Sequence, residues 1–360
     1  MAARRLLWPV IATALAARRQ STRKVYSGRW DAYVRWCSEQ GLQPVRAPVT
    51  EVLRYLQHLS DTKAVNTIRG YITAISERHA LVSDGEHRRR ISDLEVVQTW
   101  MRGLTSLHPQ PRVRVPSWDL EIVLSALKKP PFYPLKDASL KHLTIRTAFL
   151  MALTSARRAS EVHAIRHDTL QWKADCVYAF PDEQFLPKVA TQWHVNQPIA
   201  FPALRQRGNP ELTKLCVRTT IDHYVKRTKV VRAGAGASSQ LLICFGGNQK
   251  GHPVSVQRLS KWLKMAVEIA YDQANLPRPS VKGHHVRKQA TSWADLAGVT
   301  PVDICRAATW KSSSMFARHY RLQLLHDADS DLGRRVIQLS ASSSAERATQ
   351  RRLRGRCPNQ

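Results

Sequence analysis

The sequence predicts a mainly α-helical protein with one small antiparallel β-sheet, organised as an N-terminal helical bundle and a second, mixed α/β domain. Three observations lead to this fold class. The chain has 360 residues, which corresponds to two domains at roughly 100–200 residues each. Apolar residues recur every three or four positions over the first hundred residues. Short apolar runs bounded by turn residues lie between 169 and 201.

The N-terminal bundle is expected to span residues 20–105. Four apolar stripes with helical spacing lie within it, at 26–37, 49–56, 68–75 and 94–104. Each stripe predicts one amphipathic helix. Helices of this kind bury their apolar faces against one another, so the four together predict a small bundle.

The segments on either side of this bundle are basic. Residues 1–19 hold arginines and no acidic residue, and predict a basic arm that binds a polyanionic partner. Residues 106–117 hold three prolines, which favour extended chain and predict a linker. Arg112 and Arg114 are predicted to bind the phosphate backbone from this linker. Ser117 is expected to cap the helix that follows.

The second domain is expected at residues 118–325, followed at 326–360 by a further helix and a basic tail. A small antiparallel sheet is predicted between 169 and 201, with apolar runs at 176–180 and 198–201. Helical periodicity predicts helices at 120–127, 140–153, around Arg158, and at 212–225, 256–271, 286–297, 301–308 and 312–325.

The charge of the chain indicates the class of partner. Its 56 Lys and Arg residues against 27 Asp and Glu residues give a formal net charge of +29, well above what solubility requires. We therefore expect a polyanionic partner, namely double-stranded DNA. No run of eighteen apolar residues is present, so we expect no membrane-spanning segment and no membrane partner.

Residue patterns that bind metals and cofactors are scarce. The six cysteines show no C-x-x-C spacing, and no cluster of carboxylates follows a strand to recruit Mg²⁺. The sequence also has no Walker A loop, no G-x-G-x-x-G and no H-E-x-x-H. We expect no metal and no cofactor. If this protein cuts DNA, cationic side chains must replace the metal.

Candidate catalytic residues lie in three separated segments of the second domain. The first contains R-x-x-E, the second H-x-x-R at the start of a helix, and the third a tryptophan followed ten residues later by a tyrosine. In chain order these residues are Arg158, Glu161, His284, Arg287, Trp310 and Tyr320. Their order resembles the tyrosine recombinases, the phage-integrase and Xer-type family. That family is marked by T-G-x-R-x-x-E, then H-x-x-R, then a His or Trp shortly before a Tyr.

The resemblance covers roughly residues 20–340. It implies a core-binding, SAM-like bundle and a tyrosine-recombinase catalytic domain. It also implies a site-specific recombinase or integrase that cuts and rejoins DNA through a 3′-phosphotyrosyl intermediate on Tyr320, without metal or ATP. The working form would be a tetramer on DNA, in which a C-terminal exchange helix, at 332–339 here, docks on a neighbouring subunit.

Physical chemistry supports the roles that the resemblance implies for the cations. A phenol, with a pKa of about 10, is a weak nucleophile at neutral pH. Arg158 and Arg287 would grip the non-bridging phosphate oxygens through paired N–H donors. Each fixed donor of this kind stabilises a charged transition state by about 3–4 kcal/mol. His284 would assist proton transfer or hold the phosphate, and Trp310 would donate its indole N–H or pack against the site.

Two further roles are assigned with alternatives. The family's β-hairpin lysine protonates the leaving 5′-oxygen, and Lys188 is the first candidate for this role, with Lys173 as the second. Glu161 is expected to orient Arg158 through a helix salt bridge. Arg157, next to Arg158, is an alternative phosphate ligand and otherwise a DNA contact.

The sequence departs from the family pattern at three places. Ser155 stands in place of the usual glycine. Lys288, expected to contact DNA, occupies a position where many members have a second histidine. The interval from Trp310 to Tyr320 is one residue longer than usual. The tryptophan and the doubled arginine are similar to the eukaryotic, DIRS-type retrotransposon branch, which would make the protein part of a mobile element.

Three functions are therefore open at this stage: a recombinase, a type IB topoisomerase-like enzyme that relaxes DNA, and a DNA-binding protein derived from a mobile element that has lost catalysis. The longer interval before Tyr320 favours the last. In a eukaryotic host we expect the nucleus, since the basic ends fit import signals, and in a prokaryotic host the cytoplasm or nucleoid. Organellar import is a lesser alternative for residues 1–24.

Overall fold

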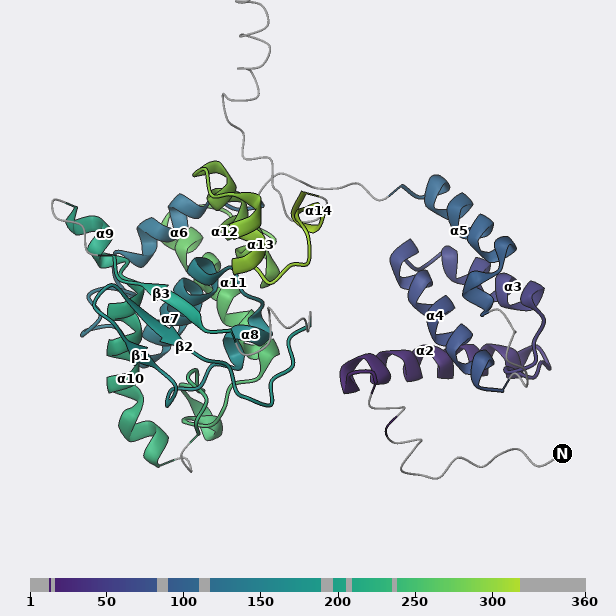
Figure 1. The fold of residues 1–360 in the computed structure, drawn as a ribbon, viewed down its shortest axis with the longest axis horizontal. Helices are drawn as coiled ribbons and strands as arrows, with labels where there is room; N and C mark the ends of the chain where they lie inside the picture. Colours follow the sequence, from purple (N-terminus) through teal and green to yellow (C-terminus); the bar gives the residue numbers. More distant parts are fainter. Residues whose placement is uncertain are drawn as a thin grey trace, which may run out of the picture. The chain divides into compact units, whose positions relative to one another are not determined.

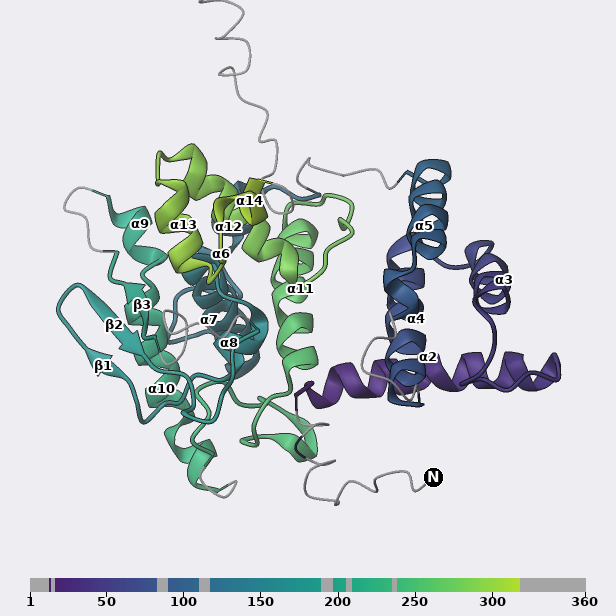
Figure 2. The same cartoon turned by 45° about the vertical axis from the view of Figure 1, so that its right-hand side comes forward.

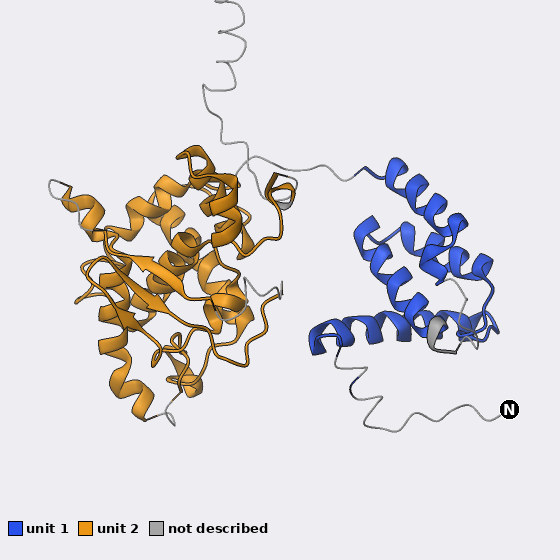
Figure 3. Ribbon diagram, viewed as in Figure 1, with its two compact units in different colours: residues 1–112 blue, residues 113–360 orange. Residues whose placement is uncertain are grey.

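The chain divides into two compact units, residues Met1–Arg112 and Val113–Gln360 (Figure 3). This division falls within the segment 106–117. The computed structural model describes residues 13, 17–82, 90–109, 117–188, 197–204, 209–234 and 238–317. Several predicted features lie outside the described residues: most of the basic arm, Arg112, Arg114, Tyr320 and the segment 332–339.

The described part of unit 1 is a helical bundle, as predicted (Figure 1). Each of the four predicted stripes falls on one α-helix. A short 3-10 helix, which the stripes did not indicate, precedes the last. The elements are α2 (Gln20–Glu39), α3 (Val49–Ser60), α4 (Val65–Val82), η1 (Ile91–Asp93) and α5 (Glu95–Leu107).

The core of unit 1 forms where the apolar stripes meet. Tyr33 and Cys37, one turn apart on α2, are fully buried, as are Leu56 of α3 and Ile68 of α4. The rings of Tyr33 and Tyr55 lie 5.1 Å apart at a tilted angle. The spacing of three and four residues thus places one face of each helix in a shared core.

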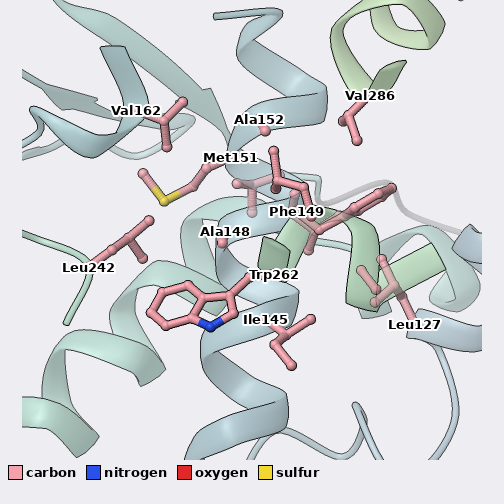
Figure 4. Packing of buried hydrophobic residues seen from close by; sticks show 14 of the residues in the cluster. Leu127, Ile145, Ala148, Phe149, Met151, Ala152, Val162, Leu242, Trp262 and Val286 are labelled. Atoms are coloured by element: carbon pink, nitrogen blue, oxygen red, sulfur yellow. The ribbon is translucent and has the colours of Figure 1, made fainter. Parts of the chain in front are cut away.

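Unit 2 is mainly helical and is built around one buried helix, α7. Helix α7 contacts α10, α11 and α12, and most of its side chains are buried. Figure 4 shows Phe149 and Met151 of α7 packed among side chains from several other elements, including Trp262 and Val286. The helices are α6 (Leu120–Leu127), α7 (Leu140–Ser155), α8 (Ala159–His163), α9 (Pro210–Lys214), α10 (Val217–Ala233), η2 (Gly247–Gln249), α11 (Val256–Gln273), α12 (His284–Leu296), α13 (Pro301–Ala307) and α14 (Ser313–Met315).

The predicted sheet is present and antiparallel. Strands β1 (Gln171–Trp172), β2 (Cys176–Ala179) and β3 (Ile199–Pro202) are hydrogen-bonded in the order β1-β2-β3. Val177 of β2 pairs with Phe201 of β3, and both side chains are fully buried. The apolar faces of β2 and β3 therefore join the core of unit 2.

Two predictions about helix ends in unit 2 are wrong. Asp119, not Ser117, caps α6, because its carboxylate accepts a hydrogen bond of 2.7 Å from the backbone N–H of Glu121. The predicted helix at 212–225 is two helices, α9 and α10, separated at Leu215 and Cys216.

The last predicted helix, at 312–325, is described only in its first turn, α14. Within the described segments, no helix is both long enough and apolar enough to cross a membrane.

Candidate active site

Arg158 follows a sharp break at the end of α7. Ala156 adopts a left-handed conformation, with φ of 51°, and Arg158 is extended and precedes the first residue of α8. The prediction that Arg158 lies inside a helix is therefore wrong. Ser155 is the last residue of α7, whereas Ala156 has a positive φ, so the position that favours glycine is Ala156 and the departure assigned to Ser155 belongs there.

Arg158 is held by Glu161, but not across a helix face as predicted. Its Nη1 donates to Glu161 Oε1 at 2.7 Å, while its backbone N–H donates to Glu161 Oε2 at 3.4 Å. Glu161 is only 2% exposed, so this ion pair is largely shielded from solvent. The carboxylate caps the start of α8 and fixes the guanidinium in one place.

Thr309 connects this ion pair to a second segment of the chain. Nη1 of Arg158 also donates to Thr309 Oγ1 at 2.9 Å, and Oγ1 lies 3.1 Å from Glu161 Oε1. Thr309 is buried and has a φ of 54°, a conformation that β-branched residues rarely adopt. Backbone strain of this kind persists where surrounding contacts impose it. The sequence motifs did not predict a role for Thr309, because its only distinguishing feature in the sequence is its position next to Trp310.

Arg287 reaches the same turn from α12. Its Nη2 donates to the carbonyl oxygen of Ala308, and its guanidinium carbon lies 4.7 Å from the centre of the Trp310 ring. Arg287 is 4% exposed. Arg158 and Arg287, 129 positions apart in the sequence, thus donate to adjacent residues, Thr309 and Ala308.

Trp310 is both a core residue and a neighbour of Arg287. Its ring stacks on Phe316 at 5.8 Å with an angle of 20° between the planes. It belongs to a small cluster with residues of α13, namely Ile304 and Cys305, and with Ala156. Helices α12, α13 and α14 lie together in both views of the ribbon (Figure 2). Packing in this cluster therefore holds the Ala308–Trp310 turn in place between the two arginines.

His284 begins α12, three residues before Arg287, and is exposed. Its ring meets that of His285 edge-on, with 4.7 Å between ring centres. Partial loss of hydration at the ring, with Lys288 and Lys282 nearby, lowers the pKa of His284 and so favours the neutral imidazole. Within the described part of the chain, no three His, Cys, Asp or Glu side chains are grouped so as to hold a metal ion.

The two candidate lysines lie on different connections of the sheet. Lys188 is exposed on the connection between β2 and β3. Lys173 is exposed in the tight turn between β1 and β2, where its backbone N–H donates to the carbonyl of Cys176 at 2.9 Å. The choice between them stays a prediction.

Arg157 and Lys288 flank the candidate site. The side chain of Arg157 is only 11% exposed and its Nη1 lies 3.9 Å from Glu161 Oε2. Burial lowers the pKa of Arg157, while Glu161 acts in the opposite direction. Lys288 is half-buried on α12. Their predicted contacts with DNA stay predictions.

The structure therefore brings four of the predicted residues together. Arg158, Glu161 and Arg287 lie around the turn that contains Trp310, so the four residues meet although they come from three segments of the sequence. His284 lies on the same helix as Arg287. Tyr320, the predicted nucleophile, lies three residues beyond the last described residue.

A scan against protein-family models and a search of curated proteins give no match. Solved structures, by contrast, are similar over most of the chain. The Tn1549 transposon integrase in complex with transposon right-end DNA is 14% identical, with a TM-score of 0.55 over 89% of this chain and 95% of that one.

Two other solved structures agree. A lambda integrase tetramer bound to a Holliday junction is 12% identical, with a TM-score of 0.52 over 86% of this chain and 74% of that one. The XerH site-specific recombinase bound to a palindromic difH substrate is 12% identical, with a TM-score of 0.51 over 80% of this chain and 70% of that one. The chain thus has the fold of the tyrosine recombinases.

Proposed function

We propose that the protein is a site-specific DNA recombinase that cuts and rejoins DNA through a 3′-phosphotyrosyl intermediate, without metal or ATP. One observation carries this proposal: Arg158 and Arg287 converge on the Ala308–Trp310 turn, and the guanidinium of Arg287 lies over the Trp310 ring. Two guanidiniums that donate to adjacent residues of one turn suit the two non-bridging oxygens of one phosphate.

In the proposed reaction, the phenolic oxygen of Tyr320 attacks the phosphorus atom. The bond between Tyr320 Oη and phosphorus forms as the bond from phosphorus to O5′ breaks. Negative charge grows on the non-bridging oxygens, where Arg158 and Arg287 stabilise it. Because contacts to protein atoms already position both guanidiniums, little reorganisation accompanies the reaction. The phosphodiester bond energy is retained in the tyrosyl ester, so rejoining needs no ATP.

Two protons move in this step. The imidazole of His284, whose lowered pKa favours the neutral form, has a free ring nitrogen that can accept the phenolic proton of Tyr320. The leaving O5′ receives a proton from the ammonium group of Lys188. Attack by O5′ of a second strand reverses both transfers and releases Tyr320.

Unit 1 offers a surface for the phosphate backbone. A pocket of about 610 Å³ lies between the first turns of α2 and the end of α4. One of its cations, Arg18, pairs with Glu77 at 3.0 Å and lies over the Tyr26 ring. Its other charged lining residues are the cations Arg23, Lys24 and Arg78. With a net charge of +29 on the chain, such a pocket supports binding to duplex DNA chiefly through phosphate contacts.

Exchange of strands between two duplexes needs two cuts on each partner. We therefore infer a tetramer as the working form. One of the similar structures is a lambda integrase tetramer on a Holliday junction, which supports this assembly.

The test is a covalent adduct on DNA. Purified protein is incubated with nicked duplex DNA in EDTA and separated on a denaturing gel, beside Tyr320→Phe. Tyr178→Phe is the matched control, since it removes a phenol from β2 of the same unit. We expect an adduct from the parent and the control and none from Tyr320→Phe. Exchanged DNA products then distinguish recombination from topoisomerase-like relaxation, and tight binding without any adduct indicates a non-catalytic DNA-binding protein.

A further inference from the structure

Helix α12 presents polar side chains on two different sides. His284 and Arg287, three residues apart, lie on the side of the candidate active site. His285 and Gln289, four residues apart, share a second side, because residues at this spacing are neighbours on a helix surface. The proposed reaction uses only the first side.

The second side binds the last residue of the predicted linker, Ser117, and the residue after it, Trp118. Nδ1 of His285 lies 3.3 Å from Ser117 Oγ, across 168 positions of sequence. The same Nδ1 accepts a hydrogen bond of 3.4 Å from the backbone N–H of Lys282, so it carries no proton and Ser117 is the donor. One turn later, Gln289 Nε2 donates to the carbonyl oxygen of Trp118 at 2.6 Å.

Ser117 and Trp118 are firmly attached to unit 2. Trp118 is only 3% exposed, and its ring meets Phe149 of α7 edge-on at 6.1 Å. The next backbone N–H, of Asp119, donates to the hydroxyl of Tyr271 on α11 at 2.8 Å. The end of the linker is therefore joined to α7, α11 and α12 within three residues.

Gln289 is an unusual choice for packing alone. It is 1% exposed, and its second polar atom, Oε1, is buried with no hydrogen-bond partner among the described residues. A buried acceptor without a donor destabilises a fold, and an apolar side chain of similar size would avoid that penalty. Its hydrogen bond to Trp118 is the evident reason for an amide at this position.

We propose that His285 and Gln289 are positioning residues that attach the end of the interdomain linker to the helix carrying His284 and Arg287. This inference rests on the proposed function. Through Ser117 and Trp118, DNA bound along the linker acts on the first two turns of α12. The attachment therefore acts on the placement of Arg287, and on cleavage more than on binding, because a small misplacement of a catalytic group slows a reaction strongly.

The test compares hydrogen exchange in α12 with and without duplex DNA, on the full chain. The variants are Ser117→Ala, His285→Ala and Gln289→Leu. Ser117 is exposed, so its variant folds even if Gln289→Leu does not. The chain offers matched controls: His142→Ala removes another Ser–His contact, to Ser139 at 2.9 Å, and Gln273→Leu removes another glutamine bond to a carbonyl, of Pro130 at 2.7 Å.

We expect DNA to slow exchange in α12 of the parent and of both controls. In the three variants this slowing is lost, DNA affinity stays within about twofold and the cleavage rate falls about tenfold. Slowing that persists in Ser117→Ala and His285→Ala overturns the proposal, as does a parent whose α12 does not respond to DNA. If the proposed function is wrong, the parent protein forms no covalent adduct with DNA. The effect of the variants on hydrogen exchange in α12 still tests the proposed attachment.

Discussion

Nη1 of Arg158 donates a hydrogen bond of 2.9 Å to Oγ1 of Thr309, 151 positions later in the chain. The hydroxyl of Thr309 in turn lies 3.1 Å from Glu161 Oε1. These three side chains fix the turn that also receives Arg287. The distance between the two arginines therefore depends on Thr309, a residue that none of the sequence motifs contains.

Thr309 is expected to be essential to the site through its hydroxyl. Thr309→Val keeps the shape but leaves Arg158 and the buried carboxylate of Glu161 short of a partner. We expect the free energy of unfolding to fall by about 1–3 kcal/mol. The rate of cleavage should fall at least about tenfold, because Arg158 is no longer held in place to stabilise the transition state. Thr309→Ser should retain most of the stability and most of the cleavage rate. Denaturant unfolding and adduct formation measure the two effects, and equal cleavage by the valine and serine variants would refute this role.

Lys188 is expected to protonate the leaving O5′. Lys188→Ala should slow cleavage of ordinary DNA. On a substrate with sulfur in the 5′-bridging position the variant should regain its cleavage rate, because a thiolate leaves without a proton. Lys173→Ala is the matched comparison. If Lys173→Ala shows the defect and the sulfur recovery instead, Lys173 is the acid. Single-turnover cleavage of the two substrates gives the answer.

The stability of unit 2 is expected to depend on pH through His285. Burial, with His284, Lys288 and Lys282 nearby, lowers the pKa of His285 to about 4. An unfolded histidine titrates near 6.5, so between about pH 6.5 and 4 the unfolded chain binds a proton that the folded chain does not. Stability is therefore fully present above this window and decreases as the pH falls through it.

The variant His285→Asn tests the pH effect. It should remove about 1 kcal/mol of the difference in unfolding free energy between pH 7.5 and 4.5, a figure reduced for partial exposure of the ring. Urea unfolding at the two values measures this difference. An unchanged pH dependence in the variant would show that His285 is not the group responsible.

Binding to duplex DNA is expected to weaken steeply with salt. Arg23, exposed at the pocket of unit 1, should contribute one phosphate contact. Arg23→Ala should reduce the slope of log K against log salt by about 0.9, and equally for unrelated sequences. Arg54→Ala is the control, since Arg54 is exposed in the same unit but already pairs with Glu51 at 2.8 Å. Equal slopes for the parent and Arg23→Ala would exclude this contact.

Periodicity predicted most of the fold because local spacing determines which face of an element is apolar. The bounds of α6 match the prediction, strand β2 lies within the predicted run 176–180, and strand β3 is shifted by one residue from the predicted run 198–201. The H-x-x-R pattern correctly places His284 and Arg287 on one helix.

The conformation around Arg158 could not be predicted in the same way. The segment 154–162 has ordinary helix-forming residues, and alanine favours helix. The left-handed Ala156 arises from long-range contacts, including the small cluster with Trp310 and the bond from Arg158 to Thr309. The contact of Ser117 with His285 is likewise long-range, and no local signal marks either partner.

Mass spectrometry of the covalent adduct tests the central claim most directly. The adduct formed in EDTA is digested with protease and nuclease, and the modified residue is identified. We predict a nucleotide joined through its 3′-phosphate to Tyr320. This adduct should be absent from Arg158→Ala and Arg287→Ala under conditions where these variants still bind DNA. A nucleotide on any other residue, or no adduct from a protein that binds DNA, would contradict the proposed tyrosine chemistry.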